Sequence, residues 1–209
     1  MSAAESNVEP LVQSAAQALG SGQLESAEAL CRDALRLQPK HPGALAFLGA
    51  ALLGRSRFGE AEEIFNGLAL QQPDESAHWI NLGNARRGLQ RFDAAIDAFA
   101  RAAALGERSA DFFYNVGLAH LDRADFESAR AVLGEAATQQ PRDAPIRYAQ
   151  ALACHESLQP DAALAALADW RNFDDLDQEL LADIAQLLMN LGANADAEEA
   201  LARLMLDPA

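Results

Sequence analysis

The sequence predicts an all-α fold assembled from consecutive helical hairpins. Apolar residues recur at steps of three and four almost everywhere, which is the spacing of one face of a helix. No run of Val, Ile, Thr and aromatic residues alternates with polar residues over the length of a half-buried strand. A pattern of small and large residues also returns every 34 residues, which indicates an array of repeated units.

The repeat predicts six units that start near residues 8, 42, 76, 110, 144 and 178. We expect residues 1–7 to be a flexible N-terminal tail and residues 8–209 to be a single solenoid. Position eight of every unit is small: Ala15, Gly49, Gly83, Gly117, Ala151 and Ala185. Position twenty is always alanine: Ala27, Ala61, Ala95, Ala129, Ala163 and Ala197. Small residues at these two positions let paired helices approach closely.

Larger apolar residues occupy other fixed positions of the unit. Position four holds Leu11, Leu45, Trp79 and Phe113, and position twenty-four holds Cys31, Phe65, Phe99, Leu133, Leu167 and Leu201. Turn segments such as GRSRFGE and GLQRFDA separate the first helix of a unit from the second. Pro39, Pro73 and Pro141 are predicted to end second helices, and Asp74 is predicted to cap the helix that follows Pro73.

Trp79, Leu82 with Gly83, Ala95 and Phe99 match the signature of the tetratricopeptide repeat, so nearly the whole chain resembles that family, of the bacterial type. The resemblance implies an α-solenoid, a right-handed superhelix whose first helices line a concave groove.

Some positions depart from the family pattern. Arg86 and His120 replace the signature Tyr, and Glu107 and Asp175 stand where Pro39 stands in its unit. The fifth unit places Arg147 and Gln150 at positions where other units have large apolar residues. The packing of the fifth unit is therefore expected to differ from that of the others.

Polar and aromatic residues that packing leaves unexplained predict a peptide-binding groove. The candidate groove residues are Asn81, Asn84, Arg87, Tyr114, Asn115 and Tyr148. Asn81 and Asn115 occupy the same position of successive units, and an amide offers both a donor and an acceptor to a peptide backbone. The first helices of the last two units add acidic residues, which favour a peptide that carries Lys or Arg.

Composition excludes several classes of function. The formal net charge of −15 opposes binding to nucleic acid or to anionic membranes, and no segment is long and apolar enough to span a bilayer. Cys31 and Cys154 are too far apart in sequence for a metal spacing, and we expect both to be reduced. No phosphate loop, calcium loop or catalytic constellation emerges, so no cofactor, metal site or catalytic residue is predicted.

The predicted function is therefore a cytoplasmic protein–protein interaction module that is not itself an enzyme. Two alternatives remain open. The chain is a substrate-recruiting or regulatory N-terminal domain of a larger transferase, such as a sulfotransferase or glycosyltransferase, to which similar bacterial repeats are often joined. Alternatively it is a self-assembling scaffold, a homo-oligomer formed through an uncapped C-terminal repeat that leaves Leu201, Leu204 and Met205 partly exposed.

Overall fold

The computed structural model describes residues 5–174 and 176–206 of the chain. Within these ranges the chain forms α-helices joined by short turns, and the only β-pairing is a single parallel bridge between Asp143 and Asp174. The all-α prediction is confirmed. Asp175, which the repeat places at the proline position, lies outside the described residues.

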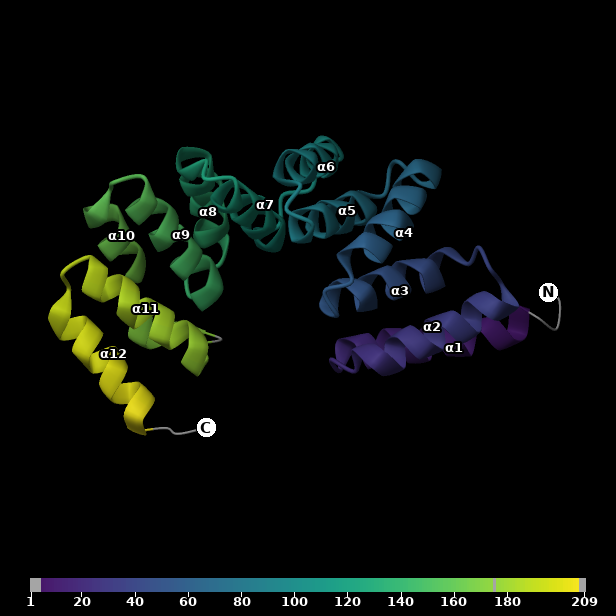
Figure 1. Cartoon of the computed structure of the whole chain (residues 1–209), viewed down its shortest axis with the longest axis horizontal. Coiled ribbons are helices and arrows are strands. Elements are labelled where there is room, and N and C mark those ends of the chain that lie inside the picture. Colours follow the sequence, from purple (N-terminus) through teal and green to yellow (C-terminus); the bar gives the residue numbers. More distant parts are fainter. Residues whose placement is uncertain (1–4, 175, 207–209) are drawn as a thin grey trace. The chain divides into compact units, whose positions relative to one another are not determined.

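The chain divides into two compact units, residues 1–107 and 108–209. Unit 1 contains the hairpins α1/α2, α3/α4 and α5/α6, with the bounds Glu5–Gly20, Leu24–Leu37, Pro42–Gly54, Phe58–Gln71, Ser76–Gly88 and Phe92–Ala104 (Figure 1). Unit 2 contains α7/α8, α9/α10 and α11/α12, with the bounds Ala110–Asp122, Phe126–Gln139, Ala144–Glu156, Pro160–Leu167, Gln178–Asn190 and Asn194–Leu206. Each unit thus holds three of the six predicted hairpins, while a single solenoid over residues 8–209 stays a prediction.

The first helix begins earlier than the repeat suggests. Helix α1 starts at Glu5, so residues 5–7 of the predicted tail are helical, and residues 1–4 lie outside the described residues. Each first helix packs on its own second helix; in unit 1, α3 also packs on α1 and α5, and in unit 2, α9 also packs on α7 and α11. This neighbour-on-neighbour packing is what a linear array of hairpins requires.

The turn inside each hairpin confirms the repeat at the level of the backbone. Position fifteen of all six 34-residue repeats has a positive φ, at Gly22, Ser56, Gln90, Ala124, Leu158 and Gly192. Only the first and last of these are glycines, although the left-handed conformation costs other residues about 1 to 2 kcal/mol. The shape of the turn is therefore imposed by the two helices that it joins, and residue type is secondary.

Position eight packs against position twenty-four in the second, third and fourth hairpins. A Cβ added to Gly83 would lie 2.5 Å from the Phe99 ring, and one added to Gly49 would lie 2.6 Å from the Phe65 ring. In the first hairpin, where position eight is Ala15, position twenty-four is the smaller Cys31, and both are fully buried. Small and large residues thus compensate one another at the closest approach of the paired helices.

Substituting alanine for Gly83 is expected to destabilise unit 1 by up to about 2 kcal/mol. The added methyl group overlaps the buried Phe99 ring, and overpacking of this kind costs about 1 to 3 kcal/mol. The higher helix propensity of alanine offsets about 0.8 to 1.0 kcal/mol of that loss. Urea unfolding followed by circular dichroism measures the difference.

The matched control is Gly67→Ala, because Gly67 lies inside α4 and an added Cβ would meet nothing within 4 Å. This variant gains helix propensity without a clash, so we expect it to be more stable than the parent by up to about 1 kcal/mol. Equal effects of the two substitutions would contradict the close contact between Gly83 and Phe99.

Helix ends follow local sequence in most places. Helices α2, α4 and α8 each end two residues before Pro39, Pro73 and Pro141, as predicted. The N-cap prediction for Asp74 is wrong, because Glu75 occupies that position and its side chain makes no capping hydrogen bond. Asp125, Asp143 and Asp177 do cap helices, each accepting a hydrogen bond from the backbone N–H three residues ahead.

The fifth hairpin departs from the others, as the sequence predicts. Helix α10 stops at Leu167 after only eight residues, and the chain then forms a single 3₁₀ turn at Trp170–Asn172. Trp170 lies in the core of unit 2 with only 1% of its surface exposed, among buried residues of α9, α10 and α11. The indole ring fills space that the short helix leaves.

Candidate functional site

The six predicted groove residues are divided between the two compact units. Asn81, Asn84 and Arg87 lie on α5 of unit 1, and Tyr114, Asn115 and Tyr148 lie on α7 and α9 of unit 2. All six side chains are half-buried. Their combination into one groove stays a prediction.

Asn81 and Asn115 adopt the same pose in their separate helices. The Asn81 amide Nδ2 donates to the Ala77 carbonyl at 2.9 Å, and Asn115 Nδ2 donates to the Asp111 carbonyl at 2.8 Å. Each amide is thereby held one turn back along its own helix. Its oxygen and second N–H are not used by that bond, so each helix presents one acceptor and one donor in a defined orientation.

Asn84 differs from the other two asparagines because its amide oxygen is buried. The Oδ1 atom has no hydrogen-bond partner among the described residues, although a buried carbonyl of this kind normally has one. Arg87 lies one turn further along α5 and is half-buried. These two residues share the α5 surface with Asn81, so unit 1 places three polar side chains along one first helix.

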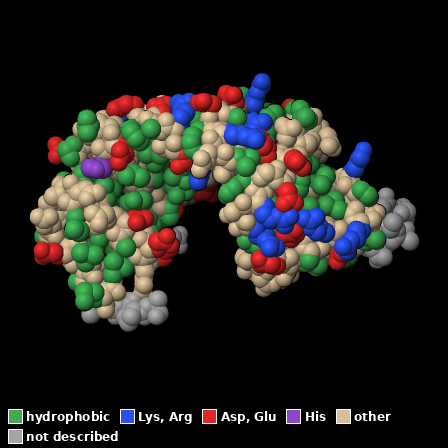
Figure 2. Space-filling model, in the orientation of Figure 1, with side chains coloured by type: hydrophobic (Ala, Val, Ile, Leu, Met, Phe, Trp, Pro, Cys, Tyr) green, Lys and Arg blue, Asp and Glu red, His purple; other side chains and the backbone are tan. Residues whose placement is uncertain are grey.

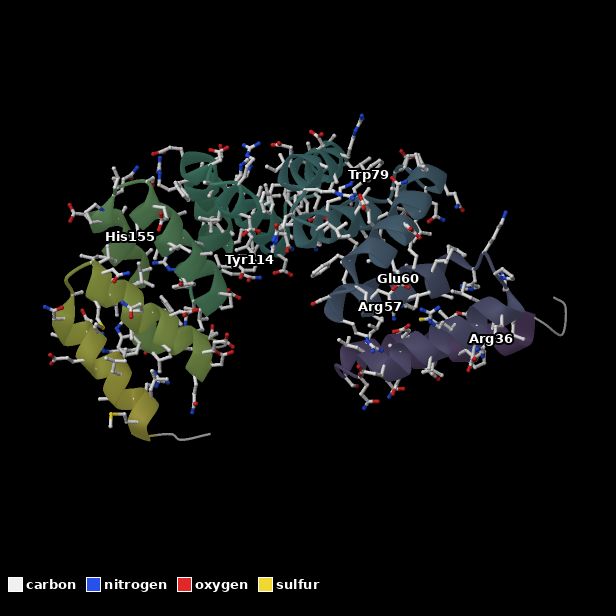
Figure 3. All side chains as sticks on the ribbon, in the orientation of Figure 1. Arg36, Arg57, Glu60, Trp79, Tyr114 and His155 are labelled. Atoms are coloured by element: carbon white, nitrogen blue, oxygen red, sulfur yellow. The ribbon has the colours of Figure 1, made fainter. Side chains whose placement is uncertain are left out.

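The two tyrosines take part in packing more than the sequence indicates. Tyr114, which is labelled in Figure 3, packs against two clusters of buried residues from α7, α8 and α9. Tyr148 packs against the core that includes buried residues of α9 and α11. Burial raises the pKa of the Tyr148 hydroxyl, and the nearby negative charge of Asp183 raises it further. Both tyrosines are therefore held firmly by the core.

Unit 1 carries a dense ion cluster that sequence reasoning missed. Figure 2 shows basic and acidic side chains gathered together on this part of the surface, and Arg57 lies beside Glu60 where α4 begins (Figure 3). The cluster centres on Glu28, whose carboxylate accepts hydrogen bonds from Arg32, Arg55 and Arg57 at 2.8, 3.0 and 2.6 Å. We call these four residues the Glu28 cluster.

Burial raises the pKa of the Glu28 carboxyl, but the hydrogen bonds and positive charges of Arg32 and Arg57 outweigh it, so the net pKa is below its ordinary value. The carboxylate is therefore ionised at neutral pH and fully engaged by the surrounding guanidinium groups. The cluster joins α2 to the turn before α4, which is a structural role.

Unit 2 contains a polar pocket of about 540 Å³ over α8, α9 and α10. Its lining is Arg130, Ala131, Gly134, Glu135, Thr138, Arg147, Gln150, Cys154, Ala162, Ala165 and Ala166. Arg147 and Gln150 are the two polar residues that stand at packing positions of the fifth repeat. Polar residues at these packing positions are the sequence feature that could have indicated the pocket.

Other candidate chemistry is limited within the described part of the chain. No group of three or more His, Cys, Asp and Glu side chains there is placed to hold a metal ion. Both cysteines are buried free thiols, as predicted; burial, assisted by the Glu28 charge, raises the pKa of Cys31 to about 11. A thiol with such a pKa is a poor nucleophile at neutral pH.

Two further sequence predictions concern surfaces. None of the described helices is long and apolar enough to cross a membrane. On α12, Leu201 and Met205 keep 41% and 83% of their surfaces exposed, and Leu204 is half-buried. Self-assembly through this helix stays a prediction.

Matches to models of a known protein family cover several of the repeated hairpins. Family models described as tetratricopeptide repeat match residues 18–83, 57–111 and 80–144, so the matches extend from residue 18 to residue 144. No curated protein sequence matches the chain.

Several solved structures are similar to the chain. PilW, described as a widely conserved type IV pilus biogenesis factor, is 20% identical with a TM-score of 0.81, over 96% of this chain and 93% of that chain. TTC0263, a thermophilic TPR protein of Thermus thermophilus, is 22% identical with a TM-score of 0.72, over 87% and 99%. A chain of the APC/C hetero-tetramer Cut9-Hcn1 is 17% identical with a TM-score of 0.73, over 92% and 38%.

Identities this low carry the fold alone, and that fold is an α-solenoid of tetratricopeptide repeats, so the predicted fold class is confirmed. The family matches, the six hairpins and the packing of position eight against position twenty-four agree with one another. The chain belongs to the tetratricopeptide repeat family.

Proposed function

We propose that the chain is a protein-interaction module whose first helices bind an extended peptide segment of a partner protein. Repeats of this family generally serve as protein-interaction modules. One of the similar chains was solved within a hetero-tetramer of Cut9 and Hcn1, which is an assembly of proteins.

The observation that carries the proposal is the shared pose of Asn81 and Asn115. Each amide is anchored to its own helix by one hydrogen bond and keeps an oxygen and an N–H for a ligand. A peptide backbone offers the complementary N–H and carbonyl whatever its side chains. Because the amides are anchored before binding, less side-chain entropy is lost when the peptide docks.

The charge of unit 2 indicates what kind of segment it binds. Glu156 on α9 and Glu179 and Asp183 on α11 are exposed acidic residues of its first helices. A peptide with Lys or Arg complements them, and the overall net charge of −15 steers a basic segment toward the chain. Binding to unit 2 should therefore weaken as the salt concentration rises.

We expect Asn81→Ala and Asn115→Ala each to weaken binding of a peptide that docks on the corresponding helix by roughly three- to tenfold. That range follows from losing one side-chain hydrogen bond, worth about 0.5 to 1.5 kcal/mol. The experiment selects peptides from a library of basic sequences and measures their affinity by fluorescence polarisation for the parent and for each variant.

Asn66→Ala is the matched control, because Asn66 is an exposed asparagine on the second helix α4. It should leave peptide affinity unchanged. If selected peptides bind both Asn81→Ala and Asn115→Ala as tightly as the parent, the amides do not contact the peptide and the proposal is wrong.

A further inference from the structure

The pocket of unit 2 exists because the fifth hairpin lacks the large apolar residues of its neighbours. At position four, where α5 has Trp79 and α7 has Phe113, α9 has Arg147. At position seven, where α5 has Leu82, α9 has Gln150. The wall opposite is formed by the small side chains of Ala162, Ala165 and Ala166 on the short helix α10. Polar groups therefore line a space that apolar side chains would otherwise occupy.

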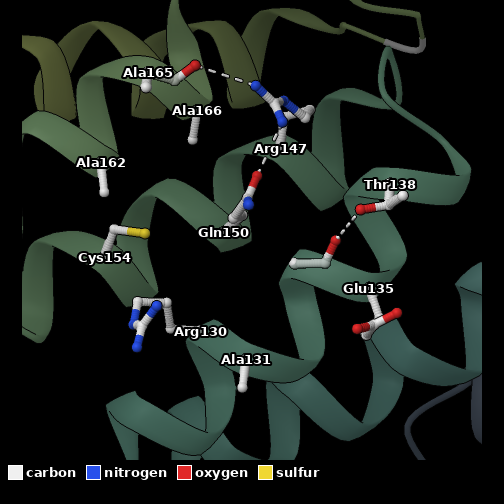
Figure 4. A pocket seen from close by; sticks show the side chains of 11 residues that line it. Arg130, Ala131, Glu135, Thr138, Arg147, Gln150, Cys154, Ala162, Ala165 and Ala166 are labelled. Carbon is white, nitrogen blue, oxygen red and sulfur yellow. Dashed lines mark hydrogen bonds between the residues drawn. The ribbon is translucent and has the colours of Figure 1, made fainter.

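Arg147 is a charged group of this pocket whose hydrogen bonds go to neutral partners. Its Nη1 donates to Gln150 Oε1 at 3.0 Å and its Nη2 donates to the Ala165 carbonyl at 3.2 Å (Figure 4). The buried Nε has no partner among the described residues. A guanidinium carries five N–H donors, so one hydrogen remains on each Nη. Burial lowers the pKa of Arg147 although the charge of Asp169 opposes this, and arginine stays charged at neutral pH.

The other titratable groups that line the pocket are an arginine, a carboxylate and a thiol. Arg130 faces the pocket from α8 and pairs at 2.9 Å with Glu127, which is not part of the lining. Glu135 is an exposed carboxylate at the rim, and Cys154 is a buried thiol whose pKa is raised by burial. Among the described residues, Arg147 is thus the cation of the lining whose hydrogen bonds go to neutral groups, whereas Arg130 is paired with Glu127.

Unit 1 offers an internal comparison. A pocket of about 290 Å³ over α2 and α3 is lined by Arg32, Leu35, Arg36 and Leu48. Its arginines are paired with Glu28 and Asp33, and Leu48 stands at the position that Gln150 occupies in the fifth hairpin. Compared with this pocket, the pocket of unit 2 is larger and holds a cation whose hydrogen-bond partners are neutral.

We propose that the unit 2 pocket binds a small organic anion through Arg147. The carboxylate or phosphate group of the ligand accepts hydrogen bonds from the remaining Nη hydrogens of Arg147, and Arg130 adds positive charge. The Gln150 amide and the Thr138 hydroxyl lie in the same lining and are suited to the polar body of the ligand. A volume of about 540 Å³ falls in the range of small-molecule sites, which favours an organic anion over a bare inorganic ion.

Isothermal titration calorimetry with succinate and with glycerol 3-phosphate, at ionic strength matched with potassium chloride, tests this site in the full chain. We expect saturable binding of at least one probe, and the preferred probe distinguishes a carboxylate ligand from a phosphate ligand. Arg147→Met keeps much of the side-chain length without the charge, and it should weaken binding by roughly tenfold or more, the loss expected for a charge-assisted hydrogen bond.

A second variant separates ligand binding from folding. Ala131→Leu fills the pocket from its exposed wall and leaves both arginines in place, so it should also abolish binding. The matched controls are Ala182→Leu on α11 and Arg203→Gln on α12, both exposed and outside the lining, and both should bind as the parent does. Absence of binding of both probes to the parent overturns the proposal, as does unchanged affinity in Arg147→Met or in Ala131→Leu.

Restoring the repeat pattern provides an independent measurement. Arg147→Phe combined with Gln150→Leu gives α9 the residue types that the neighbouring first helices carry at these positions. We expect this variant to lose anion binding while its melting temperature stays at or above that of the parent. A folded variant that still binds the probes contradicts the assignment of these residues to the site.

Discussion

Replacing Trp170 with alanine is expected to destabilise unit 2 by about 3 to 5 kcal/mol, the loss typical of a large aromatic residue removed from a core. The side chain is 1% exposed and packs with Leu167, Phe173 and Leu181 among the buried residues of α9, α10 and α11. It lies just after the early end of α10, and its removal leaves a cavity among these buried residues. Urea unfolding followed by circular dichroism measures the loss.

Trp170→Phe is the informative control. The indole Nε1 is buried without a hydrogen-bond partner among the described residues, so phenylalanine removes an unsatisfied donor while it keeps an aromatic ring. We expect it to cost about 1 to 2 kcal/mol, less than half the loss in Trp170→Ala. Equal losses in the two variants would show that the six-membered ring contributes little to the packing.

Substituting alanine for Glu28 is expected to destabilise unit 1 by about 2 to 4 kcal/mol. Removing one partner from a buried ion pair leaves the opposite charges unpaired and typically costs about 3 to 5 kcal/mol. The Glu28 side chain is 11% exposed, but Arg32, Arg55 and Arg57 keep 45%, 32% and 36% of their side-chain surfaces in water. Solvation of the released arginines reduces the loss below the fully buried figure.

The matched control is Glu25→Ala, which removes a 76% exposed carboxylate of the same helix that lies 3.5 Å from Arg55. An exposed pair of this kind contributes about 0 to 1 kcal/mol, so the loss should be small. A Glu25→Ala loss as large as that of Glu28→Ala would mean that the cluster does not depend on the burial of Glu28.

The pH dependence of the Glu28 contribution has a defined sign. The pKa of this carboxyl is lower in the folded chain than in the unfolded chain, where it has its ordinary value of about 4.3. Its stabilisation is therefore complete above about pH 4.3 and is lost as the pH falls through the folded value. The difference in free energy of unfolding between the parent and Glu28→Gln should therefore become smaller as the pH is lowered below about 4.3.

The proposed binding surfaces differ in how far sequence predicted them. Asn81 and Asn115 were predictable because they sit at one position of a repeat, and their anchoring bonds reach only one turn along their own helices. The roles of Tyr114 and Tyr148 were less accessible, because how deeply each ring enters the core depends on the neighbouring helices.

The pocket of unit 2 was only half predictable. Arg147 and Gln150 stood out as polar residues at packing positions, which indicated altered packing but gave no cavity. Its size depends on the early end of α10 and on alanines at the facing wall, and these come together only when α8, α9 and α10 stack.

The amino-acid sequence by itself determined the repeated hairpin of this tetratricopeptide repeat protein. Small and large residues, prolines and turns recur within each 34-residue repeat. The pairing of the two helices of a hairpin therefore follows from residues that are close in sequence. Tertiary structure alone decided where the charge and the cavities lie. Glu28 on α2 meets Arg55 and Arg57 in the turn between α3 and α4 of the next hairpin, and Trp170 is buried just after the shortened helix α10. Such contacts depend on how successive hairpins stack, because burial and pairing of these groups require side chains from several helices at once.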